Sequence, residues 1–369
     1  MDSARHTWHH KQAMSTDSKP GSHGYARRSR ARLTVLVLLG MLVLIGTLVS
    51  LWVGSYRLSP AAILQALAGE ASDSLPHHLI WNIRLPRAVA AILAGASLGL
   101  SGSIMQTLLK NPLAAPSTLG VSQGAALGAA CAIILLNTGT TFMVGNEAVL
   151  LTSRGITALC AFGGALLSVA VILALATFRQ LASETMILAG VAMGAFLSAC
   201  TMLLQYFASD LQVAATLFWT FGDLGKAGWD ENRLLALLLA PAFLLMLAQS
   251  WSFNALHWGD DVAGSLGVHN ARLRLVGLLT TCLLVAVTTA FLGIIAFIGL
   301  MAPHLMQPLV GKDQRYLLPA SSLSGALLLL LADLVSRTVI APVVIPVGII
   351  TSFAGAPLFL YLLLRRRPL

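Results

Sequence analysis

The chain has 369 residues, of which 57% are hydrophobic and only 10% are charged, and its mean hydropathy is +0.82. Because soluble domains carry roughly 25% charged residues, this composition excludes a soluble enzyme, a disordered protein and a nucleic-acid-binding module. The formal net charge is +9, but seven of the 23 Lys and Arg residues lie within positions 1–32. The basic character therefore belongs to a tail and to loops, and it indicates no nucleic-acid partner.

The N-terminal segment is polar and ends in a basic run, after which an apolar stretch covers residues 33–53. That stretch is longer than the ~7–15 apolar residues of a signal peptide and is long enough to cross a bilayer. We therefore expect a cytoplasmic, disordered tail over 1–32, with His residues whose role the sequence does not define. A single transmembrane domain over 33–369 is expected to begin with this first helix.

Further apolar segments follow in regular succession. They lie near residues 87–109, 117–137, 155–178, 185–208, 233–250, 273–292, 293–310, 317–337 and 346–364. The seventh and eighth of the ten spans run together, which predicts a tight turn near Gly293. Residues 210–228 are too short and too rich in Gly to cross, so they predict a short re-entrant or interfacial helix. The sequence predicts an all-α, polytopic membrane helix bundle with about ten transmembrane helices.

The distribution of basic residues orients this bundle. With ten spans, 16 Lys and Arg residues fall on the side of the N-terminal tail and seven fall on the opposite side. Because Lys and Arg are enriched in cytoplasmic loops, both termini are predicted to be cytoplasmic.

Small residues recur at helical spacing, as in Gly120, Gly124 and Gly128, and in the pairs Gly95/Gly99 and Gly190/Gly194. Such faces let helix backbones approach closely in a membrane. We favour packing within the chain over a dimer interface as their use.

Several kinds of chemistry are missing from the sequence. It contains no phosphate-binding Gly-x-x-x-x-Gly-Lys-[Ser/Thr], no His-Glu-x-x-His and no Gly-x-Ser-x-Gly,. The four cysteines lie in apolar stretches and form no Cys-x-x-Cys pair,. We therefore predict no catalytic residue, no metal site and no cofactor.

Asp333 and Arg337 are the ionisable residues that stand out inside the spans. Their spacing of four places them side by side on one helix. An unpaired charge at the bilayer centre costs roughly 2.5–3.5 kcal/mol on insertion scales. Either a structural ion pair or an outward-facing docking charge on Arg337 fits this pattern.

The segment Gly259–Gly267 lies in the largest internal cytoplasmic loop and has the composition of a short helix. Asp260 and Asp261 suit the N-terminal end of a helix dipole, and Gly267 suits a C-terminal stop. A docking element for a soluble partner and a plain connector fit the residues equally well.

An ordered series of short motifs resembles the FecCD-type permeases, the membrane subunits of ABC importers for iron-siderophores, haem and cobalamin. The resemblance covers about residues 33–366. It includes Arg84-Leu-Pro-Arg87, Gln106, Asn111-Pro112, Pro303-His304, Asp333 and Arg337. The chain departs from the family pattern at Gln307 and Gln314, where Arg and His are usual.

The resemblance implies how the protein works. Two permease subunits, identical or sister chains, would enclose one pathway in the lipid of the bacterial inner membrane. A pair of ATP-binding subunits would attach on the cytoplasmic side, and a periplasmic substrate-binding protein would dock outside. The chain itself would not be an enzyme. The expected cargo is an iron-siderophore, and haem and cobalamin stay open.

The resemblance also implies residue roles. Arg84, Arg87 and Arg337 would be exposed charges at the outer mouth that meet acidic residues of the binding protein. The coupling helix for the ATPase would comprise Gly259, Asp260, Asp261, Ala263, Gly264, Leu266 and Gly267. Gln205 and Trp219 would line the path. Gln106, Asn111, Pro112, Pro303, His304 and Asp333 would be structural motif positions.

Two other classes were weighed. An ion-coupled secondary transporter of a small hydrophilic solute would need intramembrane acids or helices unwound at the midplane, and acids are nearly absent from the spans. An intramembrane enzyme would need paired catalytic groups within a span, and none is found. A neighbouring reading frame that encodes a P-loop ATPase would decide for the importer.

Overall fold

The computed structural model describes residues 22–54, 56, 58–69, 74–144, 147–152, 154–179 and 183–365. In chain order the elements are α1 (Ser22–Trp52), α2 (Pro60–Leu67), α3 (Leu75–Leu79), η1 (Ile80–Arg84), α4 (Leu85–Leu108), η2 (Pro116–Leu119), α5 (Val121–Ala130), η3 (Cys131–Leu135), β1 (Gly139–Val144), β2 (Glu147–Thr152), α6 (Arg154–Arg179), α7 (Ser183–Tyr206), α8 (Asp210–Thr220), η4 (Leu224–Lys226), α9 (Trp229–Ala248), α10 (Ser250–His257), α11 (Asp260–Ser265), α12 (Asn270–Leu292), α13 (Ile298–Val310), α14 (Gln314–Thr338) and α15 (Val347–Arg365).

The predicted polytopic helix bundle is confirmed, and each of the ten predicted spans coincides with helix. Within the described residues, seven helices are long and apolar enough to cross a membrane. The apolar helices 121–135 and 347–361 are shorter, and α13 has 13 residues. A count of ten crossings therefore stays a prediction. The first helix begins at Ser22, inside the predicted polar tail, and residues 1–21 lie outside the described part.

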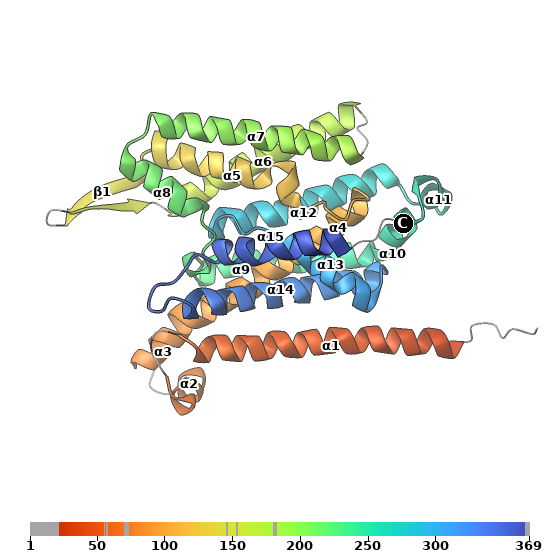
Figure 1. Ribbon diagram of the computed structural model, residues 1–369, viewed down its shortest axis with the longest axis horizontal. Coiled ribbons are helices and arrows are strands. Elements are labelled where there is room, and N and C mark those ends of the chain that lie inside the picture. The colour runs from red at the N-terminus through yellow and green to blue at the C-terminus, as the bar shows by residue number, and fades with distance from the viewer. Residues whose placement is uncertain are drawn as a thin grey trace, which may run out of the picture.

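The long helices lie side by side, and the two ends of the bundle differ (Figure 1). The α11 end holds the start of α1, the short helices α10 and α11, and the end of α15. The α8 end holds α2, α3, α8 and the β1–β2 hairpin. The positive-inside prediction places the α11 end in the cytoplasm.

Helix α4 forms the centre of the bundle, and most of its residues are buried. It packs against α12, α13 and α14, which come from the opposite end of the sequence. Exposed large hydrophobic side chains are frequent on the peripheral helices α1, α6, α7 and α9. An apolar outer surface is what a bundle in lipid requires, because lipid tails are as apolar as the side chains that meet them.

Glycines account for the close helix contacts, as the sequence predicted. A Cβ atom at Gly99 would overlap the carbonyl oxygen of Ser321 on α14, and one at Gly128 would overlap that of Cys160 on α6. The same holds for Gly95, Gly124 and Gly190, each of which faces another backbone of this chain. The prediction that these faces pack within the chain is confirmed.

The antiparallel pairing of β1 with β2 was not predicted from the sequence. The hairpin projects from the α8 end between η3 and α6 (Figure 1). Its residues include Thr, Val and Phe, which have high β-propensity, but in the sequence they fall in the connection between two predicted spans,.

Candidate functional site

Arg84 lies at the α8 end, where α4 begins. Its guanidinium donates hydrogen bonds to the carbonyl oxygens of Leu51 at 2.6 Å and Trp52 at 3.1 Å, and also to that of Tyr56. The last carbonyls of a helix have no partner within the helix. Arg84 therefore caps the C-terminal end of α1 and fixes it against the start of α4.

Asp333 is a fully buried acid on α14 that pairs with two arginines. Arg87 Nε donates to its carboxylate at 2.6 Å, and Arg337 Nη2 lies 2.9 Å from it. Arg87 also reaches Asp223, with 3.6 Å between the charged atoms. Arg337 donates to the carbonyl oxygens of Ser50 at 3.2 Å and of Val53 at 3.0 Å. This network joins α1, α4, α14 and the loop after α8.

The expectation that the three arginines are exposed at a mouth is wrong. Arg84 and Arg337 are 6% and 8% exposed, and the Arg87 side chain is 12% exposed. Their charges are compensated within the chain, by helix-end carbonyls and by Asp333. Of the two readings left open for Arg337, the structure shows the structural ion pair. Docking by these residues would require the network to open first.

At the opposite end, α11 is the short helix that the loop composition predicted, and Gly267 follows it with φ +81°. Its first residue, Asp260, pairs with Lys110 at 3.0 Å and with Arg274 at 2.8 Å. Lys110 follows α4 and Arg274 lies in the first turns of α12. A shift of α11 would therefore act, through these two ion pairs, on α4 and α12, two of the most buried helices of the bundle.

The charges around Asp260 keep this link intact at neutral pH. Burial works against ionisation of Asp260, but the hydrogen bonds and charges of Lys110 and Arg274 outweigh it and hold its pKa below the ordinary value,. The pairing is therefore fully present above about pH 4 and is lost as the pH falls through the lowered pKa.

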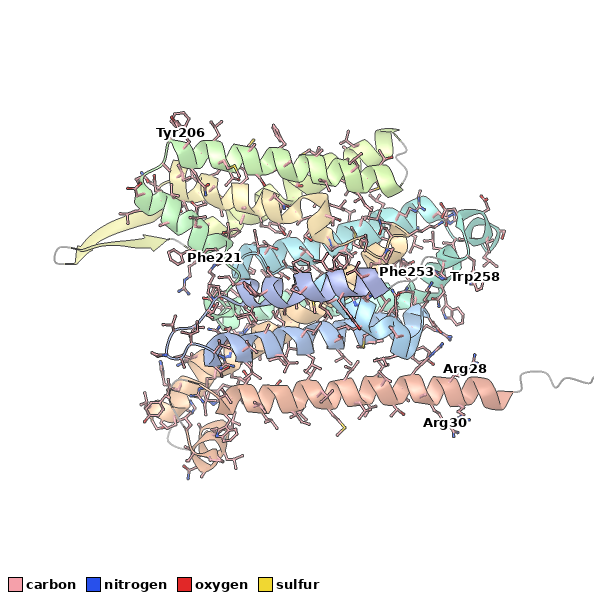
Figure 2. The ribbon with its side chains drawn as sticks, viewed as in Figure 1. Arg28, Arg30, Tyr206, Phe221, Phe253 and Trp258 are labelled. Carbon is pink, nitrogen blue, oxygen red and sulfur yellow. The ribbon has the colours of Figure 1, made fainter. Side chains whose placement is uncertain are left out.

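The exposed side of α11 and the residues next to it form what we call the α11 face. It comprises Trp258, Val262, Gly264 and Leu266. Trp258 is 78% exposed and points away from the bundle (Figure 2). Ala263 was expected on this face, but its side chain is fully buried within the chain. By contrast, a Cβ atom added at Gly264 meets no atom within 4 Å.

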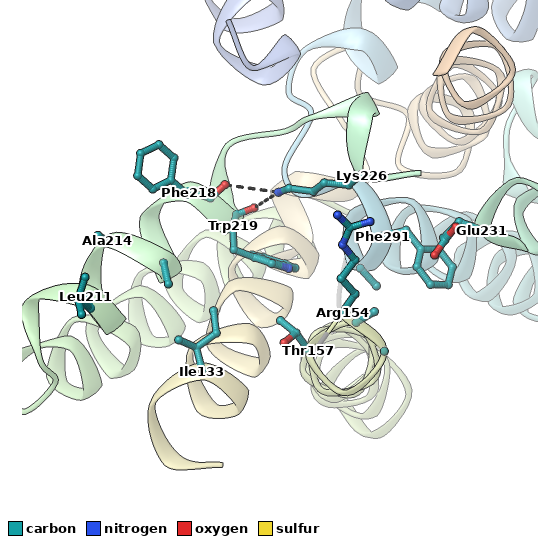
Figure 3. A pocket seen from close by; sticks show the side chains of 14 residues that line it. Ile133, Arg154, Thr157, Leu211, Ala214, Phe218, Trp219, Lys226, Glu231 and Phe291 are labelled. Atoms are coloured by element: carbon teal, nitrogen blue, oxygen red, sulfur yellow. Dashed lines mark hydrogen bonds between the residues drawn. The ribbon is translucent and has the colours of Figure 1, made fainter. Parts of the chain in front are cut away.

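A cavity of about 540 Å³ opens at the α8 end, between α6, α8, α9 and α12 (Figure 3). Its walls are formed by Ile133, Arg154, Gly155, Thr157, Ala158, Leu211, Ala214, Ala215, Phe218, Trp219, Lys226, Glu231, Ala290 and Phe291. Trp219 lines this cavity, and its role in a translocation path stays a prediction. Gln205 lies near the end of α7 and is not part of this wall. The short helix predicted over 210–228 is present as α8.

Backbone breaks converge beside this cavity. In the loop after α8, the backbone N–H of Asp223 donates to the carbonyl oxygen of Leu292 at 2.8 Å. The backbone N–H of Ile294 donates to the carbonyl oxygen of Thr220 at 3.3 Å. Gly348 N, in the first turn of α15, donates to the carbonyl of Gly222 at 3.0 Å. Non-helical backbone at membrane depth is tolerated where protein buries it or where it lines a cavity.

The remaining motif positions lie at the α11 end around a second cavity, of about 330 Å³. Gln307 Nε2 donates to Gln106 Oε1 at 3.5 Å, and Gln314 Nε2 donates to Thr107 Oγ1 at 2.9 Å. The two positions that depart from the family pattern therefore belong to an amide and hydroxyl network. Pro112 lines the same cavity, Asn111 caps its own loop, Pro303 is buried in α13, and His304 is half-buried.

The described residues contain no set of three or more His, Cys, Asp or Glu side chains close enough to hold a metal ion.

The chain is a multi-pass helix bundle with a central buried helix, broken helices beside a cavity at one end and an exposed short helix at the other. Residues 42–365 match the model of the FecCD transport family. The chain belongs to this family of ABC transporter permeases.

Individual relatives cover nearly the whole chain. An ABC transporter permease protein of Methanocaldococcus jannaschii is 46% identical over 92% of this chain and 97% of its own length. The hemin transport system permease protein HmuU of Yersinia pestis is 36% identical over 90% of this chain and 96% of its own. A solved structure described as an inward-facing, metal-chelate type ABC transporter is 30% identical, has a TM-score of 0.78 and covers 90% of this chain and 99% of its own.

Proposed function

We propose that the chain carries a metal chelate, in the first place an iron-siderophore, across the cytoplasmic membrane, using ATP hydrolysed on a separate pair of subunits. The family match over residues 42–365 supports the class of transporter. The observation that carries the coupling is the α11 face, which is exposed and is tied through Asp260 to α4 and α12. The absence of a phosphate-binding motif agrees with hydrolysis on another chain,.

The proposed assembly has three further contacts. A second permease subunit, identical or a sister chain, would share the pathway and the lipid-facing surface. ATP-binding subunits would cover the α11 face at the cytoplasmic end. A substrate-binding protein would approach the α8 end, where the cavity opens. The inference that the α11 end is cytoplasmic follows from the excess of Lys and Arg there,.

Uptake measurements test this function against the alternative of an ion-coupled secondary transporter. In cells that express the chain with its ATP-binding partner, uptake of the ferric chelate should stop when the phosphate-binding Lys of that partner is replaced. A protonophore should leave ATP-driven uptake intact in proteoliposomes that hold ATP and the ATP-binding subunits on the inside. Uptake that persists without ATP and stops with the protonophore would contradict the proposal.

The α11 face offers a graded test of coupling. Gly264→Ala should leave uptake near the wild-type rate, because the added methyl group meets open space. Gly264→Trp should abolish ATP hydrolysis stimulated by the loaded binding protein, because a packed contact with a partner cannot accept that volume without strain of about 1–3 kcal/mol. The measurements are ATPase activity and uptake of the purified complex in proteoliposomes.

Retained stimulation in Gly264→Trp would mean that α11 is only a connector. Ala263 is unsuitable for this test, because its side chain is buried in the permease itself. A bulky residue there would disturb the packing of α11 on the bundle, whether or not a partner binds.

A further inference from the structure

The cavity at the α8 end contains two cationic side chains, Arg154 and Lys226, beside the indole of Trp219 (Figure 3). Lys226 Nζ lies 3.4, 3.1 and 3.3 Å from the carbonyl oxygens of Phe218, Trp219 and Phe221. An ammonium group has three donors, so these contacts use all of them. Lys226 therefore caps the C-terminal end of α8 and keeps its position, while its charge still acts on the cavity.

Arg154 has a different environment. It is the first residue of α6, its side chain is exposed, and its guanidinium is directed toward the Lys226 side of the cavity (Figure 3). Among the described side chains, no carboxylate lies within 4 Å of it. Its donors are therefore available to a molecule in the cavity.

Glu231 is the one acid in the cavity wall. Its carboxylate accepts a hydrogen bond from Gly228 N at 2.8 Å and so closes the capping box at the start of α9. Asp223, which lies outside the cavity wall, pairs with Arg87, with 3.6 Å between the charged atoms. Neither carboxylate is paired with Arg154. The cationic side of the cavity is therefore not neutralised by either acid.

The two like charges affect each other. Burial lowers the pKa of Lys226 to about 8, and Arg154 lowers it as well, whereas Asp223 raises it. Lys226 is therefore largely protonated at pH 7 and loses its charge as the pH rises through about 8,. Two neighbouring cations repel each other, and an anion between them would relieve that repulsion.

The rest of the wall is apolar. Trp219 presents its indole, and Ala214, Ala215 and Ala158 add small side chains to the wall. A volume of about 540 Å³ lies within the range of about 300–1,000 Å³ that is typical of pockets for small molecules,. An apolar wall with a few convergent polar groups is the usual composition of such pockets.

We propose that this cavity recognises an anionic oxygen group, a carboxylate or catecholate, on a ring-bearing part of the incoming chelate. Arg154 donates directly to the anion, Lys226 supplies a fixed charge, and the indole of Trp219 contacts the ring. The proposal rests on the proposed function, because it names the class of chelate that this permease accepts at its α8 end.

The direct test is equilibrium binding of a simple probe to the full-length permease in lipid nanodiscs. The probes are 2-naphthoate and the neutral 2-naphthamide, which has nearly the same shape. Wild-type protein should bind naphthoate more tightly than naphthamide at pH 7. Arg154→Gln should weaken naphthoate binding about tenfold, while Arg154→Lys should keep part of the preference, because a point charge replaces a fork of donors.

Arg233→Gln is the matched control. Arg233 is also a cation near the α8 end, but it is 78% exposed, pairs with Asp230 at 3.1 Å and lies outside the cavity wall. Its substitution should leave both affinities unchanged. Equal affinity for naphthoate in the wild-type protein and Arg154→Gln would overturn the proposal, as would an equal loss in Arg233→Gln.

Transport separates this proposal from the proposed function. Arg154→Gln should slow uptake of an anionic ferric chelate more than uptake of a neutral one delivered by the same binding protein. If wild-type protein shows no ATP-driven uptake, the proposed function is wrong, whether or not the protein binds naphthoate. If Arg154→Gln leaves naphthoate binding intact but weakens docking of the binding protein, the cation serves a protein partner and the ligand site is wrong.

Discussion

Replacing Asp333 with Asn is expected to destabilise the permease by about 3–5 kcal/mol, the usual cost of removing one partner from a buried ion pair. Arg87 and Arg337 would keep their charges in the interior. They would lose the carboxylate that now lies 2.6 Å from Arg87 and 2.9 Å from Arg337. The helices α4, α14 and α1 meet at this point, so the loss should appear as a lower unfolding temperature in detergent and a lower yield of inserted protein.

Asp230→Asn provides the comparison for this prediction. Asp230 also pairs with an arginine, but both side chains are exposed, 90% for Asp230 and 78% for Arg233. Exposed pairs contribute about 0–1 kcal/mol, so this variant should unfold close to the wild-type temperature. Similar unfolding temperatures for Asp333→Asn and Asp230→Asn would show that the buried network does not hold the bundle together.

A double-mutant cycle can assign the energy to the pair. If Asp333 and Arg337 interact as the structure shows, removing both should cost less than the sum of the two single substitutions. Arg87 would remain as a buried charge in the double variant, so stability should be recovered only in part.

The same network shows how far the sequence could predict the site. The pairing of Asp333 with Arg337 follows from a spacing of four on one helix, and it was predicted as one of two alternatives. The pairing of Asp333 with Arg87 could not be predicted, because α4 and α14 are 246 residues apart at this contact. Burial of the arginines was also missed, since the carbonyls at the end of α1 that receive Arg84 are not visible as a sequence motif.

Helix α11 illustrates a different limit. Its existence could be predicted, because Asp at the first turn and Gly267 after the last turn are local signals. Which residue of so short a helix points inward depends on how it packs against neighbouring helices. Ala263 and Gly264 are both small residues, yet one is fully buried and the other faces open space.

In the sequence, Arg154 and Lys226 are recognisable only as basic residues of two loops. They are two of the seven Lys and Arg residues that the predicted topology places on the outer side. Their meeting in one cavity depends on the fold of the loop after α8 and on the start of α6. The resemblance predicts a path role for Trp219, and the sequence gives no sign of its cationic neighbours.

The glycine spacings, by contrast, could be interpreted correctly from sequence, and they lead to a prediction with an internal control. Gly164→Ala should destabilise the bundle by about 1–3 kcal/mol or more, the usual cost of overpacking a tight contact. Its Cβ atom would overlap the carbonyl oxygen of Gly124 and lie 3.0 Å from the nitrogen of Gly128, so α5 and α6 would have to separate.

Gly163→Ala should not destabilise the bundle. Gly163 precedes Gly164 on the same helix but is exposed, and an added Cβ atom there meets nothing within 4 Å. Alanine is favoured over glycine in a helix by about 0.8–1.0 kcal/mol, so this variant should be as stable as the wild type or slightly more so. Unfolding temperatures in detergent and uptake in proteoliposomes would be measured for both. Because α5 and α6 flank the wall of the α8-end cavity, Gly164→Ala should also slow uptake. If the two variants behave alike, backbone contact between α5 and α6 does not set the packing of this part of the bundle.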